Sequence, residues 1–147
     1  MISPEALEQI LRGYLVCALW STSAGITFDP HGVIVQDPDN DMSFLDHNFD
    51  VDDVTVLTEL SAYDDVCDFV LANIADVFAY ADQMTYDAGQ GTVWDYFGHD
   101  FWLTRNRHGA GFWDRGLGEL GERLTEACRP YGEVNLYVTD DGKVASE

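Results

Sequence analysis

The chain has no lysine or arginine between Arg12 and Arg105. Those 92 residues, 13–104, carry 17 aspartates or glutamates, and the complete chain has 27 acids against 7 bases, a net charge of −20. Binding to nucleic acid or to an anionic membrane needs a cluster of basic residues. The acidic block, residues 13–104, has none, so neither is an expected partner of this block. The block holds no fixed cation, so it cannot form salt bridges within itself, and its charges repel one another in the folded state.

The cysteines lack any C-x-x-C pair, and the chain lacks long apolar runs. Cys17, Cys67 and Cys128 each fall at an apolar position of a predicted helix, so we interpret them as small buried hydrophobes in a reducing compartment. No run approaches the roughly 18 apolar residues of a membrane span, and the N-terminus has no basic signal region. These absences predict a cytoplasmic protein without a transmembrane segment.

The apolar content is ample for a core. Hydrophobic residues make up 46 % of the 147 residues and aromatic residues 13 %, which predicts one folded domain over 1–147. Ser3 and Pro4 begin a helix predicted over 3–20, and the Asp29–Gly32 turn predicts a short hairpin. Residues 37–50 are expected to form a loop.

The remaining elements follow from periodicity and turn residues. A helix is predicted from near Asp50 or Asp52, restarted or continued at Ser61 with Asp64. An apolar stripe then runs to residue 81: Tyr63, Val66, Cys67, Val70, Ile74, Val77, Phe78 and Ala81. Residues 84–99 read as a glycine-rich loop in which Val93–Phe97 is open to one helical turn. Phe101–Thr104 and Gly111–Asp114 are expected to pair as strands, before a helix over 117–129 and a final strand ending at an Asp141-Gly142 turn. The predicted class is α+β: acidic N-terminal helices (about 1–97) followed by a small antiparallel sheet with one packed helix (about 98–147).

The C-terminal part carries a recognisable pattern. Residues 98–106 read GHDFWLTRN and residues 108–116 read HGAGFWDRG, followed by GELGERLT at 118–125 and GEVNLYV at 132–138. This pattern resembles a family of small acidic proteins of tailed bacteriophages and other mobile elements. The family has no assigned activity, so the resemblance implies an origin and a place in the host cytoplasm, but no reaction. Arg107 departs from the pattern, because a glycine is expected after Asn106 for a tight turn.

The acidic block suggests a function of its own. Duplex DNA carries one charge per about 1.7 Å of axis, and carboxylates at i and i+4 on a helix, such as Asp64 and Asp68, lie about 6 Å apart. A folded acidic face can therefore imitate a row of phosphates and compete for a DNA-binding protein. The predicted partner-binding residues are Asp37, Asp39, Asp41, Asp46, Asp50, Asp52, Asp53, Asp64, Asp65, Asp68 and Asp76.

This hypothesis describes a non-enzymatic inhibitor of a basic host protein that handles DNA, such as an anti-CRISPR or anti-restriction protein. It involves no cofactor and no metal: the Asp37-x-Asp39-x-Asp41 series lacks the glycine and the final glutamate of a calcium loop. A solvated acidic surface without mimicry, as in an acidic phage accessory protein, and adaptation to high salt remain open alternatives.

A mixed-charge cluster near the C-terminus is the second alternative. His99, Asp100, Arg105, Arg107, His108, Asp114 and Arg115 are the residues of this cluster. A small-ligand binder or an enzyme could use them, since histidine with aspartate is the minimum for acid–base chemistry. The structural interpretation is a hairpin in which Arg105 and Arg115 pair with Asp100 and Asp114, over a core of Phe101, Trp102, Phe112 and Trp113. No nucleophile or metal-ligand spacing accompanies the cluster, so no catalytic residue is expected.

Overall fold

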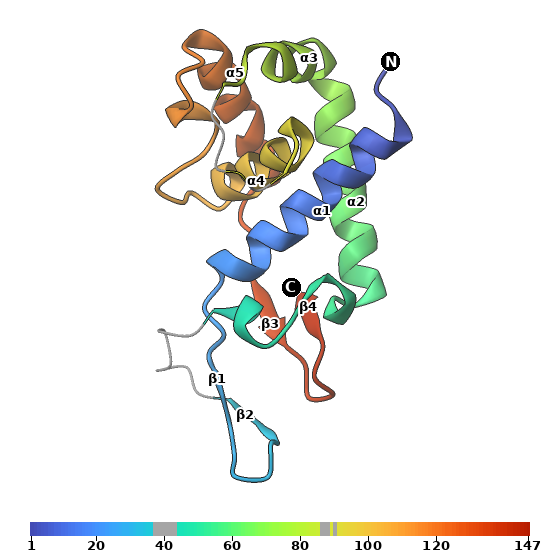
Figure 1. The fold of residues 1–147 in the computed structure, drawn as a ribbon, viewed down its shortest axis with the longest axis vertical. Helices are drawn as coiled ribbons and strands as arrows, with labels where there is room; N and C mark the ends of the chain where they lie inside the picture. Colours follow the sequence, from blue (N-terminus) through green and yellow to red (C-terminus); the bar gives the residue numbers. More distant parts are fainter. Residues whose placement is uncertain (37–43, 86–88, 90) are drawn as a thin grey trace.

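The computed structural model describes residues 1–36, 44–85, 89 and 91–147, and its class is α+β, as predicted (Figure 1). The helices are α1 (Pro4–Ser21), α2 (Val56–Ala72), α3 (Ile74–Gln83), α4 (Val93–Arg105) and α5 (Glu119–Cys128). The strands are β1 (Ile26–Phe28), β2 (Ile34–Gln36), β3 (Leu136–Val138) and β4 (Val144–Ser146). Short 3-10 turns are η1 (Leu45–His47), η2 (Val51–Asp53), η3 (Phe112–Asp114) and η4 (Arg129–Tyr131).

The first helix forms as its sequence predicts. The Ser3 side chain accepts a hydrogen bond from the Ala6 amide at the N-terminus of α1, and Pro4 occupies the first turn, where its missing N–H costs nothing. Ile10 and Tyr14, one turn apart, are buried on the same face. This face packs against α4, and the two helices form the most extensive helix pair of the fold.

Two glycines allow α1 and α4 to cross at short range. A Cβ atom on Gly98 of α4 would collide with the carbonyl oxygen of Ile10, and one on Gly13 of α1 would collide with the carbonyl oxygen of Asp95. Neither position has room for a side chain, because each backbone lies directly against the other helix. Helices far apart in the sequence thereby become the centre of the structure (Figure 1).

The second helix begins later than predicted. Asp50 caps the short turn η2, where its carboxylate accepts a hydrogen bond from the Asp52 amide, while α2 starts at Val56 with Thr55 as its cap. Val54, between η2 and that cap, is extended, and this interrupts the predicted helix. A second interruption, at Asn73, separates α2 from α3, so the predicted apolar stripe to residue 81 is divided between two helices and the break lies at Asn73, not at Ser61.

The expected strand pair at 101–114 is wrong. Phe101–Thr104 lies inside α4, and Phe112–Asp114 is the 3-10 turn η3. The Thr92 amide donates to the Asp95 carboxylate at the start of α4, and this cap begins a full helix where at most one helical turn, at Val93–Phe97, was expected. Aromatic residues favour strands on average, but here Phe97 and Phe101 occupy one helix face. The predicted division of the chain near residue 97 consequently falls in the middle of α4.

The core is aromatic. Phe69 of α2 stacks on Phe101 with ring centroids 4.2 Å apart and an interplanar angle of 9°, and Phe112 is buried beside them. Trp102 is buried, and its indole N–H donates to the Ser21 hydroxyl at 2.8 Å. Trp113 is 50 % exposed, so its expected place in the core is wrong.

Both predicted hairpins are confirmed. Strand β1 pairs with β2 in antiparallel register around the Asp29–Gly32 turn, and β3 pairs with β4 around Asp141-Gly142. The β3–β4 hairpin also fixes the start of α2, because the Thr55 amide donates to the Val144 carbonyl at 2.9 Å. Within the described residues, no helix combines the length and the apolar character that crossing a membrane requires.

Candidate functional site

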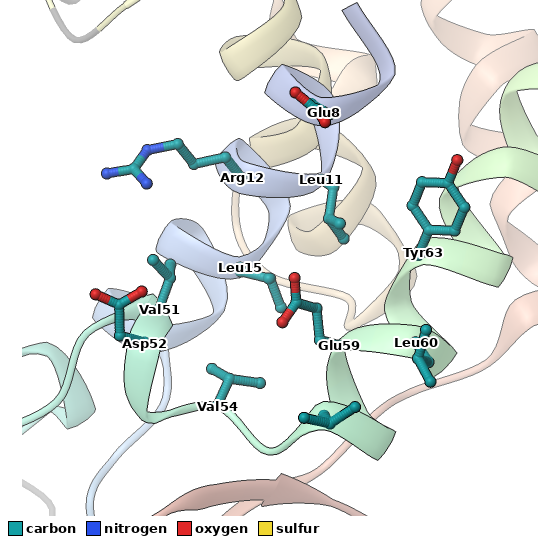
Figure 2. Close-up of a pocket in the computed structure, with 11 residues that line it drawn as sticks. Glu8, Leu11, Arg12, Leu15, Val51, Asp52, Val54, Glu59, Leu60 and Tyr63 are labelled. Carbon is teal, nitrogen blue, oxygen red and sulfur yellow. The ribbon is translucent and has the colours of Figure 1, made fainter. Parts of the chain in front are cut away.

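A groove of about 750 Å³ runs between α1 and α2 (Figure 2). Its lining residues come from α1, from η2 with the segment after it, and from the first half of α2: Glu8, Leu11, Arg12, Leu15, Val51, Asp52, Val54, Val56, Glu59, Leu60 and Tyr63. Leu15 and Val54 are buried and form its floor. The volume lies in the range of ligand pockets, and the apolar floor suits an apolar group of a partner.

An apolar stripe on α2 forms one wall of this groove and continues beyond it. Val56, Leu60, Tyr63, Cys67 and Leu71 recur at intervals of three or four residues, so they share one side of the helix. Val56 is 71 % exposed and Leu71 is 64 % exposed. The opposite side of α2, with Val66 and Phe69, is fully buried in the core. The helix therefore has two apolar faces, and the outer one is exposed within the part of the chain that the structure describes.

Charged side chains surround the groove. Three acids, Glu8, Asp52 and Glu59, line it with one cation, Arg12. Figure 2 shows the Glu59 carboxylate reaching toward Leu15, and the Arg12 guanidinium directed away from the other lining side chains. A basic residue of a partner can thus find carboxylate acceptors beside an apolar floor.

The predicted partner-binding aspartates fall into four groups, of which the fourth is Asp65 with Asp76. Asp37, Asp39 and Asp41 lie outside the described residues. Five are exposed: Asp46 on η1, Asp50 and Asp52 at η2, and Asp64 and Asp68 on α2. Only Asp52 of these five is a lining residue of the groove, and Asp68 accepts a hydrogen bond from the Tyr131 hydroxyl. Asp53 is half-buried, and its carboxylate accepts a hydrogen bond from the Asp50 amide.

Asp65 and Asp76 differ from the others because each has an arginine partner. Arg105 donates to Asp65 at 2.7 Å, and Arg123 donates to Asp76 at 3.0 Å. Both cations follow the acidic block in the sequence. Their charge neutralises the side of the block that faces α4 and α5, so these two aspartates add little to an acidic surface.

The mixed-charge cluster is divided by the fold. Asp100 is buried and receives two hydrogen bonds from Arg115 and one, at 2.8 Å, from the Tyr80 hydroxyl. Arg115 also lies 3.9 Å from Asp114. The predicted pairing of Arg115 with Asp100 and Asp114 is confirmed. These groups satisfy one another inside the protein, which makes the network structural.

The other members of the cluster point elsewhere. His99 is buried with its ring edge-on to Trp20 and Tyr96, and burial lowers its pKa below the usual 6.5. Arg105 is buried against Asp65 and Tyr14, so its expected pairing with Asp100 or Asp114 is wrong. The hairpin expected to gather an acid–base pair does not form.

The apolar groove was missed at the level of the sequence. The spacing of Tyr63, Val66, Cys67 and Val70 predicts a single apolar stripe on the helix. The structure instead places Val66 and Val70 in the core, and Tyr63 and Cys67 on the outer face. The available signal was the excess of apolar residues on α2: Val56, Leu57, Leu60 and Leu71 do not fit the core face.

Among the described residues, no group of three or more histidine, cysteine, aspartate or glutamate side chains could hold a metal ion. Comparison of the chain with protein-family models, with curated proteins and with solved structures finds no match.

Proposed function

We propose that this protein binds a basic, DNA-handling protein of a bacterial host, in the host cytoplasm, and inhibits it by occupying its DNA site. The observation that carries the proposal is the placement of exposed carboxylates along η1, η2 and the outer side of α2, on a block of 92 residues without lysine or arginine. The origin implied by the sequence resemblance is part of the proposal.

In this proposal, acids one helical turn apart on α2 take the place of neighbouring phosphates. Asp64 and Asp68 are exposed one turn apart on α2, about 6 Å from each other by helix geometry. Asp46 and Asp52 extend the negative charge across the two 3-10 turns that precede the helix. Lysine and arginine side chains placed to contact phosphates can contact these carboxylates instead. Such charges raise the association rate and select basic partners.

The groove supplies the apolar contact that charge alone lacks. Exposed ion pairs contribute about 0–1 kcal/mol each, whereas apolar side chains buried in a pocket dominate most interfaces. Leu60 and Val56 stand exposed beside the floor formed by Leu15 and Val54. A partner that inserts an apolar side chain here gains affinity, and the surrounding carboxylates orient its basic residues.

The test is capture of host-lysate proteins on the immobilised protein, followed by elution with duplex DNA. We expect the eluted proteins to be basic DNA binders whose DNA binding the protein blocks in a purified assay. A triple variant, Asp46→Asn, Asp52→Asn and Asp64→Asn, should weaken inhibition more than tenfold. The matched control, Glu119→Gln, Glu122→Gln and Asp140→Asn, changes the net charge equally at exposed positions outside the proposed surface.

A second pair of variants separates the groove from the charge. Leu60→Ala should weaken binding by a similar factor at low and high salt, because it removes an apolar contact. Leu57→Ala is its control, since Leu57 is 80 % exposed and is not a lining residue of the groove. Equal inhibition by both acidic variants, or a shift of duplex DNA by the protein itself near physiological salt, would contradict mimicry.

A further inference from the structure

A cleft of about 550 Å³ near the ends of α4 and α5 has a composition opposite to that of the rest of the molecule. Its lining residues are Thr104, Arg105, Arg107, His108, Trp113, Thr125, Cys128, Arg129 and Gly132. Three of the chain's 7 bases are therefore in one cleft, with a histidine and a half-exposed tryptophan. None of the lining residues is acidic, in a protein of net charge −20.

Arg107 is held there in an unfavourable backbone conformation. The end of α4 is a Schellman motif, in which the His108 amide donates to the Leu103 carbonyl at 2.9 Å and the Arg107 amide to the Thr104 carbonyl at 3.1 Å. This motif places Arg107 at the left-handed position, with φ of +58°, where glycine is the usual residue. Among the described residues other than glycine, only Arg107 has a positive φ. A strained residue at the edge of a cleft suggests that its side chain has a use.

We propose that this cleft binds a small phosphate-bearing molecule with an aromatic ring, of the mononucleotide class. Arg107 and Arg129 bind the phosphate, because guanidinium groups match phosphate oxygens in geometry and charge. The indole of Trp113 stacks on the ring, as aromatic side chains do with nucleobases. The volume of the cleft is within the range of small-molecule sites.

The two arginines are available for this role. The side chain of Arg107 is 85 % exposed and lies 3.9 Å from Glu133, and that of Arg129 is 75 % exposed and lies 3.0 Å from Glu126. Exposed pairs of this kind are weak, so a phosphate can replace the carboxylates. Arg105 is different, because it is buried and donates to Asp65, Tyr14 and two backbone carbonyls. It forms the floor of the cleft and does not bind the ligand.

The charge of the whole protein selects a small ligand over a nucleic acid. A polyanion crossing the surface would meet the surrounding acids, and the net charge of −20 would repel it along its whole length. A mononucleotide is small enough to lie within the cleft. At physiological salt, screening limits its repulsion by the acids outside the cleft to those within about 8 Å. The inference is independent of the proposed function, because the cleft and the groove share no lining residue.

The experiment is a calorimetric titration of the intact protein with four probes, the 5′-monophosphates of adenosine, guanosine, cytidine and uridine, with adenosine and inorganic phosphate as partial ligands. We expect at least one mononucleotide to bind at least tenfold more tightly than either partial ligand. Arg107→Gly and Arg129→Gln should each weaken binding at least tenfold. Arg123→Gln, an exposed arginine outside the cleft, should leave binding unchanged.

Arg107→Gly also guards against a folding artefact. Glycine relieves the left-handed strain, so the melting temperature of this variant should equal or exceed that of the parent protein while binding is lost. The proposal is overturned if no mononucleotide binds at millimolar concentration. It is also overturned if Arg107→Gly binds as well as the parent, or if a single-stranded oligonucleotide binds more tightly than every mononucleotide.

Discussion

Arg115 donates two hydrogen bonds, of 3.0 and 2.8 Å, to the same carboxylate oxygen of Asp100, whose side chain is 1 % exposed. The other oxygen of Asp100 accepts the Tyr80 hydroxyl. An aspartate from the acidic block is thereby fully paired inside the core by a cation that lies beyond the block. Arg115 is thus placed where a negative charge has to be buried.

Arg115→Gln should therefore destabilise the protein strongly. Removing one partner of a buried ion pair leaves an uncompensated charge and costs about 3–5 kcal/mol. The matched control is Arg123→Gln, which breaks an exposed pair with Asp76 and should cost about 1 kcal/mol or less. Chemical denaturation of both variants measures the difference. Equal losses would mean that Asp100 is not held by Arg115.

The two neighbouring tryptophans should differ in their contribution to stability. Trp102→Ala removes a buried ring and its hydrogen bond to Ser21, and should cost about 3–5 kcal/mol of unfolding free energy. Trp113→Ala should cost less than about 1 kcal/mol, because half of its side chain is exposed. Thermal or urea unfolding tests this, and a large loss for Trp113→Ala would contradict the position of η3.

Gly98→Ala should destabilise the protein although alanine favours helices. In a free helix this change gains about 1 kcal/mol, but here the added methyl group collides with the Ile10 carbonyl oxygen and forces α1 away from α4. We expect a net loss of about 1–3 kcal/mol in a denaturant melt. Gly109→Ala is the control, since a Cβ there has no neighbour within 4 Å and stability should barely change.

Burial of His99 should make stability fall in mild acid. Burial lowers the pKa of His99 in the folded state, so between its folded and unfolded values the unfolded chain binds more protons. The contribution of His99 to stability is complete above pH 6.5 and is lost as the pH falls through the folded pKa. Melting temperatures of the parent and of His99→Gln from pH 7.5 to 5.5 should show a shallower decline in the variant. His31→Gln, at an exposed turn, should decline like the parent.

Local signals in the sequence predicted the ends of the fold well. Ser3 with Pro4 marked the start of α1, and the two Asp-containing turns marked both hairpins, because caps and turns depend on residues close in sequence. The strands expected at Phe101–Thr104 and Gly111–Asp114 were wrong, because aromatic residues favour strands on average. Their helical state depends on contacts with Phe69 and on the glycine contact with α1, which are distant in sequence.

The site was predictable only in part. Composition identified the acidic block, but which aspartates are neutralised depends on Arg105 and Arg123, which reach back 40 and 47 residues. The groove depends on the direction of α2 relative to α1, and no residue pattern encodes that direction alone. The outer stripe on α2 was visible in the sequence as apolar residues in excess of one core face.

The close crossing of α1 and α4 also sets an order of events during synthesis. Helix α1 leaves the ribosome well before α4, because its partner face, centred on Gly98, follows it by more than 70 residues. Until then η1, η2 and α2 can cover only part of the apolar side of α1, and closing so long a loop to α4 is slow. The contact between α1 and α4 can consequently form only after residue 105 has emerged, and the α4-facing side of α1 is exposed to aggregation before then.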